Sequence, residues 1–383
     1  MSCRLTLITE IIAPYRIPVF NALAGLDGIK LHVVFLAETD PVRRQWLVYK
    51  NEINFSFEVL PSWRCRAGNN NVLFNWGLSA ALNRSSPDAI LCGGYNYPAA
   101  WKALSWAQRN HVPFFLWAES NLRDLRSGLR WIELLKTNFL RRCDGFVVPG
   151  KSSFDYLRAY GIREESIFTA PNAVDIRFFA RKTALVCANG GVRAQYHLPK
   201  QFFLFVGRLV AEKGVFDLLK AYQALPRSLR EKVGLVFVGD GPQQADLRQL
   251  AKKADRGTVQ FAGFVQREEL PVYYALAEAL VFPTHSDPWG LVVNEAMACG
   301  LPVICSRVAG CAEDLVQDDW NGRLVCPGDT GKLTAAMQQL SGDASLRLLM
   351  SERGRQKIAA YSPESSAAGM AAAVLSRGRA PHA

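Results

Sequence analysis

The run THSDPWGLVVNE at residues 284–295 carries two carboxylates whose spacing could serve chemistry. Asp287 and Glu295 lie eight positions apart, and a helical pattern begins near Leu291. Such a pair suits general acid and base catalysis, metal binding, or two contacts to the hydroxyl groups of one ligand. Gly290 permits close approach to an anion, and the expected helix would turn its free N–H groups and positive dipole end toward the same place.

Two cations precede this run in the segment VGRLVAEKG at 206–214. Arg208 and Lys213 follow an expected strand, and a forked guanidinium beside an ammonium suits the oxygens of a diphosphate. Two solvated loop charges would explain this motif equally well if it stood alone. Beside such a cationic site, carboxylates that hold hydroxyl groups need no metal ion.

Glycines and backbone groups follow the neighbouring strands. Gly207, Gly239 and Gly241 permit close approach of a ligand to the backbone, although ordinary turns have the same composition. The segment FAGFV at 261–265 offers the backbone of Phe264 and Val265 to a nucleotide base, or is a plain junction between a strand and a turn.

Two series of short apolar runs position these motifs. The first has expected strands at 4–9, 30–37, 55–61, 88–94, 112–119 and 144–150, with helices expected at 16–25, 73–83, 97–110 and 121–142. The second has expected strands at 202–207, 234–241, 259–263, 279–283, 302–306 and 322–327. Alternation of strand and helix predicts an α/β fold with two Rossmann-like halves, whose ligand sites form at the carboxyl ends of parallel strands.

The same patterns predict the domain boundaries. We expect an N-terminal domain at 1–178, a C-terminal domain at 199–355 and a C-terminal helix at 356–378, interrupted at Ser362 and Pro363. The apolar periodicity fails around 176–199, which is interpreted as a linker.

Composition excludes several classes of protein. The 383 residues are 49% hydrophobic and 21% charged, which is typical of globular chains, and the net charge of +11 suits anionic ligands or membrane surfaces, or aids solubility. No long basic run with interleaved aromatic residues indicates nucleic acid binding. Nine cysteines without a Cys-x-x-Cys pair predict reduced thiols in a cytoplasmic protein, without disulfides or zinc.

Neither a secretory signal nor a membrane span is expected. Glu10 and Pro14 interrupt the apolar residues of the N-terminus. No uninterrupted apolar run approaches the roughly 18 residues that a span requires.

Taken together, GRLVAEKG, VGDGP, VQFAGFV, DPWGLVVNEAMACGLPVI and, upstream, APNAVD at 170–175 resemble the GT-B retaining glycosyltransferases of family 4 in order and spacing. The resemblance covers nearly the whole second half, whereas the first half matches mainly in layout. There, APYRIPVFNAL at 13–23 is similar to members that build bacterial surface polysaccharides. The family implies two domains facing across a cleft and a C-terminal helix that returns to the first. It also implies a nucleoside diphosphate sugar donor on the second domain, and a glycan or lipid-linked acceptor on the first.

The resemblance also implies roles for individual residues. Arg208 and Lys213 would neutralise the diphosphate, Glu295 would bind ribose, and Asp287 would bind the hydroxyl groups of the donor sugar. The remaining donor-binding residues would be Pro288, Trp289, Gly290, Leu291 and Val292. A retaining reaction, with a donor phosphate oxygen as base and no metal or other cofactor, would not use the two carboxylates as a glycosidase-like acid and base.

Two departures from the family affect the site. Glu usually stands where this chain has Asp287, which retracts the carboxylate by roughly 1.5 Å. Many members have a histidine after a first-half strand, but the comparable segment WAESN at 117–121 has none, and His111 lies at the other end of that strand. The acceptor-side candidates are therefore Pro14, Tyr15, Arg16, Gly94, Tyr95, Glu119, Ser120 and Asn121. Helix capping explains Ser120 and Asn121 equally well, and His285 could touch the sugar or have no role.

Other partners and functions are weighed against this reading. The segment 121–144 is a basic amphipathic helix that would contact anionic membrane weakly, or would cover the sheet with a solvated face. An epimerase or phosphorylase on the same scaffold, or a noncatalytic nucleotide-sugar-binding protein, remain alternatives. A dehydrogenase is disfavoured because no strand precedes G-x-G-x-x-G.

Overall fold

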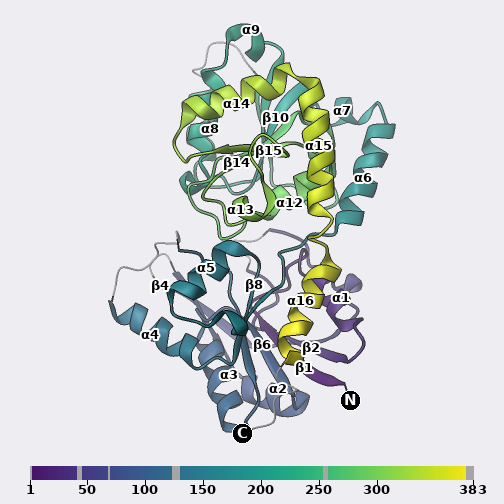
Figure 1. The fold of residues 1–383 in the computed structure, drawn as a ribbon. Helices are drawn as coiled ribbons and strands as arrows, with labels where there is room; N and C mark the ends of the chain where they lie inside the picture. The colour runs from purple at the N-terminus through teal and green to yellow at the C-terminus, as the bar shows by residue number, and fades with distance from the viewer. Residues whose placement is uncertain (1, 41–44, 68–69, 123–129, 253–257, 377–383) are drawn as a thin grey trace. The chain divides into compact units, whose positions relative to one another are not determined.

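The computed structural model describes residues 2–40, 45–67, 70–122, 130–252 and 258–376. It forms two compact units, the first comprising Met1–Val174 with Ser362–Ala383 and the second Asp175–Tyr361 (Figure 1). Each unit is built on a parallel sheet of its own, as the alternating patterns predict.

The first unit has a seven-stranded sheet in the order β3-β2-β1-β6-β7-β8-β9. The strands are β1 Cys3–Thr9, β2 Ile29–Phe35, β3 Ser56–Val59, β6 Ala89–Gly93, β7 Phe114–Trp117, β8 Gly145–Val148 and β9 Ile167–Thr169. Its helices are α1 Ile17–Ala24, α2 Leu78–Ser85, α3 Pro98–Arg109, α4 Arg130–Arg141, α5 Lys151–Ala159 and α16 Pro363–Ser376, with short 3₁₀ turns at Lys50–Glu52 and Glu164–Ser166.

Both faces of this sheet are covered, which explains the continuous apolar runs of its strands. Alternate side chains enter different cores, so Ile8 and Val34 lie on one side of the sheet, and Leu7 and Val33 on the other. Functional side chains are therefore expected beyond the strand ends rather than on the middle of the sheet.

Helix α16 packs against α1, β8 and β9 of the first unit. Its Gly369 makes the close contact feasible, because a Cβ there would lie 2.2 Å from the carbonyl oxygen of Thr169. Pro363 begins the helix, and the preceding helix ends at Ile358, so the chain breaks at the proline that the sequence singles out.

The second unit has a six-stranded sheet in the order β12-β11-β10-β13-β14-β15. The strands are β10 Gln201–Val206, β11 Val233–Val238, β12 Val259–Gly263, β13 Ala279–Phe282, β14 Val303–Ser306 and β15 Gly322–Val325. The helices are α6 Ile176–Ala188, α7 Val192–Gln195, α8 Val215–Gln223, α9 Arg227–Arg230, α10 Gln244–Lys252, α11 Leu270–Leu276, α12 Leu291–Ala298, α13 Ala312–Leu315, α14 Thr330–Gly342 and α15 Ala344–Ile358, with a 3₁₀ turn η3 at Ala211–Lys213.

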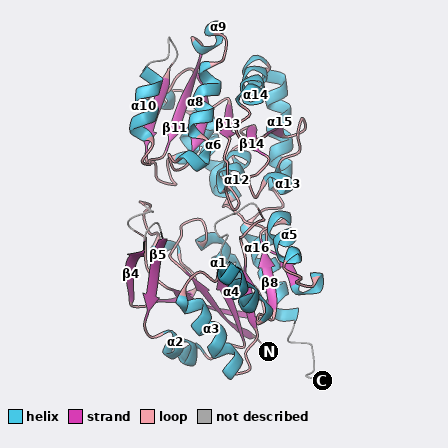
Figure 2. Cartoon of the chain, turned by 90° about the vertical axis from the view of Figure 1, so that its left-hand side faces the viewer, coloured by secondary structure: helices cyan, strands magenta, loops and turns pink. Residues whose placement is uncertain are grey.

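Two parts of the chain differ from the sequence prediction. The segment interpreted as a linker contains α6, which Asp175 caps by accepting a 2.9 Å hydrogen bond from the Phe178 N–H, and which packs on α11 and α12. The expected helix at 73–83 begins only at Leu78, because the preceding residues form an antiparallel hairpin of β4 Ser62–Ala67 and β5 Asn70–Asn75 (Figure 2).

Candidate active site

Close backbone contacts join the carboxyl ends of β10, β11 and β12 in the second unit. The Gly207 N–H donates to the Val238 carbonyl at 2.9 Å, and the Gly239 N–H donates to the Gly263 carbonyl at 2.7 Å. A Cβ at position 239 would lie 2.0 Å from the Gly207 carbonyl oxygen, so this turn requires glycine. The turns containing Gly207, Gly239 and Gly241 thus form one edge, with Gly241 packed against Leu209.

Phe264 and Val265 continue from β12 at this edge. The Phe264 side chain is 38% exposed, and Val265 is half-buried. The edge therefore has an accessible aromatic ring beside the backbone proposed for base contacts.

The turn after β10 is tied to the loop after β13. The Glu212 carbonyl oxygen accepts a 3.0 Å hydrogen bond from Thr284 Oγ1 and a 2.8 Å bond from the His285 N–H. Gly214 has a φ of +69°, and a Cβ there would lie 2.1 Å from the Pro283 carbonyl oxygen. These contacts bring the end of η3 against the stretch that holds Asp287.

Lys213 and Asp287 form an ion pair at the junction of these loops. Lys213 Nζ lies 2.5 Å from Asp287 Oδ2 and donates to the Ser286 carbonyl oxygen at 3.1 Å. The other carboxylate oxygen, Asp287 Oδ1, accepts a 3.0 Å bond from the Trp289 N–H. Asp287 therefore positions the lysine and shapes its own loop in this structure.

Trp289 is a packing residue of the loop. Its side chain is 4% exposed, and its indole N–H donates to Asn294 Oδ1 at 2.9 Å. The indole is consequently not presented to a ligand. Pro288 precedes it, and a Cβ at Gly310 would lie 1.8 Å from the Pro288 carbonyl oxygen, so two loops pass close together here.

Helix α12 begins immediately after Gly290, as its glycine and apolar pattern predict. Gly290 has a φ of +101°, and a Cβ there would lie 2.7 Å from the Phe282 ring. Because glycine has no capping side chain, the first-turn N–H groups at Leu291 and Val292 remain suited to an anion. Both residues are half-buried.

Glu295 lies in the second turn of α12 and is bound by a tyrosine. Its Oε2 accepts a 2.6 Å hydrogen bond from the Tyr274 hydroxyl, and Tyr274 is buried. Burial raises the pKa of Glu295 to about 7, although the tyrosine hydrogen bond acts in the opposite direction. This carboxyl group therefore changes its charge near neutral pH.

Arg208 and His285 have partners of their own. Arg208 pairs with Glu212 at 3.1 Å, and both side chains are about half exposed, so the pair is weak and open to rearrangement. His285 Nε2 lies 2.6 Å from Asp217 Oδ2 on α8. In this structure, His285 thus attaches the loop after β13 to α8.

The first unit has a pocket of about 200 Å³ at the carboxyl ends of its strands. Arg16 donates from Nη1 to Thr9 Oγ1 at 2.7 Å and from Nη2 to Glu119 Oε2 at 3.3 Å. Its guanidinium lies 4.4 Å from the centre of the Trp117 ring. The pocket is lined by Glu10, Ile11, Ala13, Tyr15, Arg16, Asp40, Trp46 and Glu119.

Three of the sequence-based acceptor candidates, Tyr15, Arg16 and Glu119, thus come together. The other five, Pro14, Gly94, Tyr95, Ser120 and Asn121, do not line the pocket. The Tyr95 hydroxyl lies 3.0 Å from that of Tyr156. Tyr95 therefore serves packing against the helices of this unit.

Sequence reasoning missed Glu10, Asp40, Trp46 and their neighbour Arg64. Arg64 lies on the unexpected hairpin and reaches Asp40 at 2.7 Å and Glu10 at 3.5 Å. A signal existed for the two carboxylates, since Glu10 follows β1 directly and Asp40 comes soon after β2. Ligand sites form at the carboxyl ends of parallel strands, and both carboxylates lie just beyond such strand ends.

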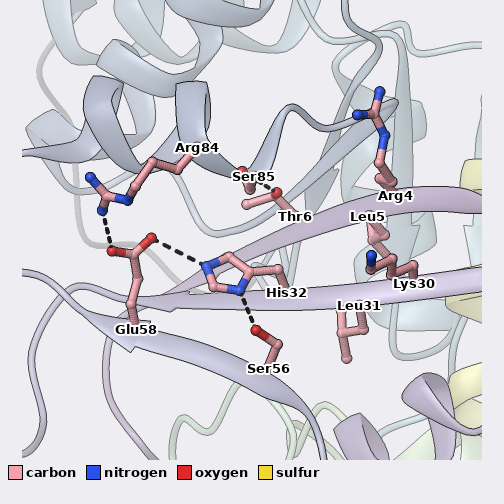
Figure 3. Close-up of a pocket in the computed structure, with 10 residues that line it drawn as sticks. All are labelled: Arg4, Leu5, Thr6, Lys30, Leu31, His32, Ser56, Glu58, Arg84 and Ser85. Atoms are coloured by element: carbon pink, nitrogen blue, oxygen red, sulfur yellow. Dashed lines mark hydrogen bonds and ion pairs between the residues drawn. The ribbon is translucent and has the colours of Figure 1, made fainter.

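A larger hollow of about 450 Å³ lies by the amino-terminal halves of β1 and β2 and the start of β3. Figure 3 shows His32 between Ser56 and Glu58, with Arg84 on the other oxygen of Glu58. These polar side chains pair with one another, and the hollow is away from the strand ends where the sites of such folds form.

Neither a metal-binding cluster nor a membrane-spanning helix is found in the described part of the chain. Within the described ranges, no three His, Cys, Asp or Glu side chains are grouped so that they could hold a metal ion. In the same part of the chain, no helix is long and apolar enough to cross a membrane.

Comparisons with known proteins cover both halves of the chain. The family described as Glycosyltransferase Family 4 matches residues 20–178, and that described as Glycosyl transferases group 1 matches residues 193–357. The O-antigen chain mannosyltransferase B of Escherichia coli is 31% identical over 56% of this chain and 55% of its own length. The alpha-D-kanosaminyltransferase of Streptomyces kanamyceticus is 33% identical over 42% of each protein. The matches thus span about half the length of these relatives.

Solved structures share the fold over nearly the whole chain. Anabaena HepE in complex with UDP and glucose aligns with a TM-score of 0.74 and 18% identity, covering 97% of this chain and 99% of that one. WaaG, a glycosyltransferase involved in lipopolysaccharide biosynthesis, aligns with a TM-score of 0.67 and 17% identity over the same shares. With two Rossmann-like sheets and both family matches in the expected order, the chain belongs to the GT-B glycosyltransferases of family 4 and group 1.

Proposed function

We propose that the protein transfers a sugar from a nucleoside diphosphate sugar to a glycan or lipid-linked acceptor in the synthesis of a surface polysaccharide. The observation that carries the proposal is the ion pair of Lys213 with Asp287 in the loop that leads directly into α12, the helix that holds Glu295. The names of the similar proteins, among them an O-antigen mannosyltransferase and a lipopolysaccharide core glycosyltransferase, support this class of product.

The donor would lie along the edge of the second unit. Lys213 and Arg208 would neutralise the diphosphate, once Arg208 has left its exposed partner Glu212. The backbone of Gly290–Val292 would bind the distal phosphate. Glu295 would accept a ribose hydroxyl group. Phe264 and Val265 would contact the base. In the related structure of HepE, the ligand is UDP-glucose, which is consistent with a donor of this class.

The chemistry would rest on stabilising the leaving group. Breaking the bond between the anomeric carbon and the phosphate oxygen places negative charge on the diphosphate and positive charge on the sugar. Lys213 and the N–H groups of α12 are suited to the first charge. The acceptor hydroxyl would attack from the same face, with its proton passing to a donor phosphate oxygen, so that configuration is retained without a metal ion.

The decisive variants are Lys213→Ala and Glu295→Ala, with Lys220→Ala as the matched control on the exposed side of α8. Purified wild type is mixed with nucleoside diphosphate sugars and an acceptor extract, and release of the nucleoside diphosphate is measured. Both site variants should lose at least about 100-fold in activity, since each removes a group that contacts the donor. Lys220→Ala should retain it, and all three should unfold cooperatively. Full activity in either site variant would remove the proposed donor site, and conversion of the donor into an epimeric nucleoside diphosphate sugar without acceptor would favour an epimerase.

We also propose weak membrane contact through 121–144, of which 123–129 lie outside the described residues. Helix α4 leaves Leu134 71% exposed and Leu135 46% exposed, and Arg141 is exposed near its end. Apolar and basic groups together favour an anionic surface. At low salt, part of the protein should float with anionic liposomes, and a double Leu134→Ser, Leu135→Ser variant should float less. Wild type that stays entirely in the soluble fraction would end this proposal.

A further inference from the structure

Asp40 has a buried oxygen that lacks a donor. The residue is 3% exposed and lines the pocket of about 200 Å³ in the first unit. Its Oδ2 meets Arg64 at 2.7 Å, but no hydrogen bond reaches Oδ1. A buried carboxylate oxygen left without a donor is destabilising, so a ligand that donates a hydrogen bond here would gain affinity.

The charges around this pocket are unfavourable to a second anion. Among the described residues at the pocket, the three carboxylates of Glu10, Asp40 and Glu119 outnumber the two guanidiniums of Arg16 and Arg64 by one. Each guanidinium is already engaged, Arg16 by Glu119 at 3.3 Å and Arg64 by Asp40 at 2.7 Å. A phosphate or carboxylate entering the pocket would therefore meet a net negative charge and have to compete for cations already in use.

The remaining wall is suited to the carbon face of a sugar. Tyr15 and Trp46 meet edge to face with ring centres 5.9 Å apart, and Ala13 lies beside them. Aromatic side chains of this kind combine an apolar body with a polar tip. The volume of about 200 Å³ is several times the roughly 30 Å³ that a water molecule takes in the liquid, so the pocket has room for a ligand larger than one water molecule.

A metal ion is another ligand that carboxylates attract. Glu10, Asp40 and Glu119 do not form one of the groups of three that could hold an ion, since none is found in the described part of the chain. The hydrogen-bond donors of a sugar that suit such oxygens are its hydroxyl groups and any amino group.

We propose that this pocket binds a sugar unit of the acceptor through its hydroxyl groups and selects units that carry no anionic substituent. The inference rests on the proposed function and names the acceptor class. Asp40 Oδ1 accepts one hydroxyl group, the half-buried carboxylates of Glu10 and Glu119 accept others, and Tyr15 and Trp46 contact the ring. Asp40 is thus a specificity residue, without a part in breaking the donor bond.

The test compares neutral and anionic forms of the same sugars. A panel of methyl hexosides, the matching methyl hexuronides and the matching hexose 6-phosphates is titrated into the full-length protein, and binding is followed by ligand-observed NMR. At least one neutral hexoside should bind at least about tenfold more tightly than its uronide and its phosphate. An anionic form that binds as tightly as its neutral match, or the absence of binding by every neutral hexoside, would overturn the proposal.

Asp40→Asn is the informative variant because it retains the shape and removes one charge. It should weaken binding of the neutral hexoside at least about fivefold. It should also reduce the ratio between the affinities for the neutral hexoside and for its uronide. Asp27→Asn, the same change at an exposed position, should alter neither value. If Asp40→Asn does not fold, as judged by its thermal transition, Glu10→Gln at the half-buried rim takes its place, with the same narrowing expected. Unchanged selectivity in the folded variant would overturn the role of this pocket.

Binding of UDP and GDP, measured on the same samples, separates this inference from the proposed function. If UDP or GDP binds but the sugars show no selectivity, only the proposal about the acceptor class is contradicted. Sugar selectivity together with failed nucleotide binding removes the donor site and leaves a saccharide pocket.

Discussion

Lys213 and Asp287 form an ion pair at the centre of the proposed donor site. The 2.5 Å contact holds the ammonium at the loop junction, but an arriving diphosphate would compete with Asp287 for it. Asp287 Oδ2 would then accept a hydrogen bond from a sugar hydroxyl group, in the role that the family resemblance implies. Side-chain length at this position therefore bears on the sugar more than on the nucleotide.

The substitution Asp287→Glu tests this reading. It advances the carboxylate by roughly 1.5 Å, the length of one C–C bond. We expect the ratio of kcat/KM between two donor sugars to change by at least about fivefold, whereas the affinity for the free nucleoside diphosphate changes less than about threefold. Steady-state kinetics with paired donors and calorimetry with the diphosphate measure the two effects. A uniform loss for all donors would contradict the assignment to the sugar.

Glu295 predicts a pH dependence of donor binding. Burial raises its pKa to about 7, and only the ionised form is a full acceptor for ribose hydroxyl groups. With that pKa, the ionised fraction falls by about tenfold between pH 8 and pH 6. We therefore expect the affinity for the nucleoside diphosphate to fall by up to about tenfold over this range, as measured by calorimetry.

Glu295→Gln supplies the control for the pH effect. The variant should bind more weakly at pH 8 and show a flatter profile than wild type. The free energy of unfolding of wild type should change with pH in the opposite sense to its affinity for the nucleotide. Because the raised pKa lets the folded state of wild type hold a proton that the unfolded state releases, wild type loses stability as the pH rises from about 4.5 to about 7. A wild-type affinity profile as flat as that of the variant would contradict the role of Glu295.

At the scale of elements, glycines determine how closely the loops of the donor edge pack. Gly214 combines a φ of +69° with a Cβ position 2.1 Å from the Pro283 carbonyl oxygen. Gly328 has a similar φ of +75° but open space around its Cβ position. Comparing alanine substitutions at the two positions therefore distinguishes the cost of backbone strain from the cost of a steric clash.

Gly214→Ala should therefore lower the free energy of unfolding more than Gly328→Ala does. We expect about 2 to 4 kcal/mol of destabilisation for the first and about 1 kcal/mol for the second, measured by urea unfolding. The first should also weaken nucleotide binding, since it separates η3 from the loop that holds Asp287. Equal effects of the two substitutions would show that strain alone determines the cost.

The strands of the second unit could be predicted closely from sequence because both sheet faces bury apolar side chains. The runs expected at 259–263 and 302–306 correspond to β12 and β14 within one residue at either end. Helix α6 was missed because Phe179 and Thr183 are its only buried residues, too few to give a clear period. The hairpin β4 and β5 was missed because its strands mix aromatic and polar residues.

The acceptor-side pocket was harder to predict than the donor motifs. The donor residues lie in a few short loops, and the resemblance carries their roles. The first-unit pocket depends instead on Arg64, which pairs with Asp40 from 24 positions later on the unexpected hairpin, and on Trp46, which lines the pocket from a loop without regular structure. Such pairings follow from tertiary packing, which local patterns do not encode.

At the scale of the whole molecule, two units with separate cores have different chemical character. The candidate edge of Asp175–Tyr361 offers cations and a helix N-terminus, and the pocket of the first unit offers carboxylates and aromatic rings. The first suits a diphosphate and the second suits hydroxyl groups. This contrast is consistent with the proposed transfer from an anionic donor to a sugar acceptor.

The measurement that tests the central claim most directly is thermal unfolding with a panel of nucleoside diphosphates. At a concentration a hundredfold above its dissociation constant, a ligand stabilises the folded state by about 2.7 kcal/mol, so at least one diphosphate should raise the Tm of wild type by several degrees. Lys213→Ala should lose most of this shift, and Lys220→Ala should keep it. No shift with any nucleoside diphosphate, or an undiminished shift in Lys213→Ala, would contradict a donor site built around Lys213.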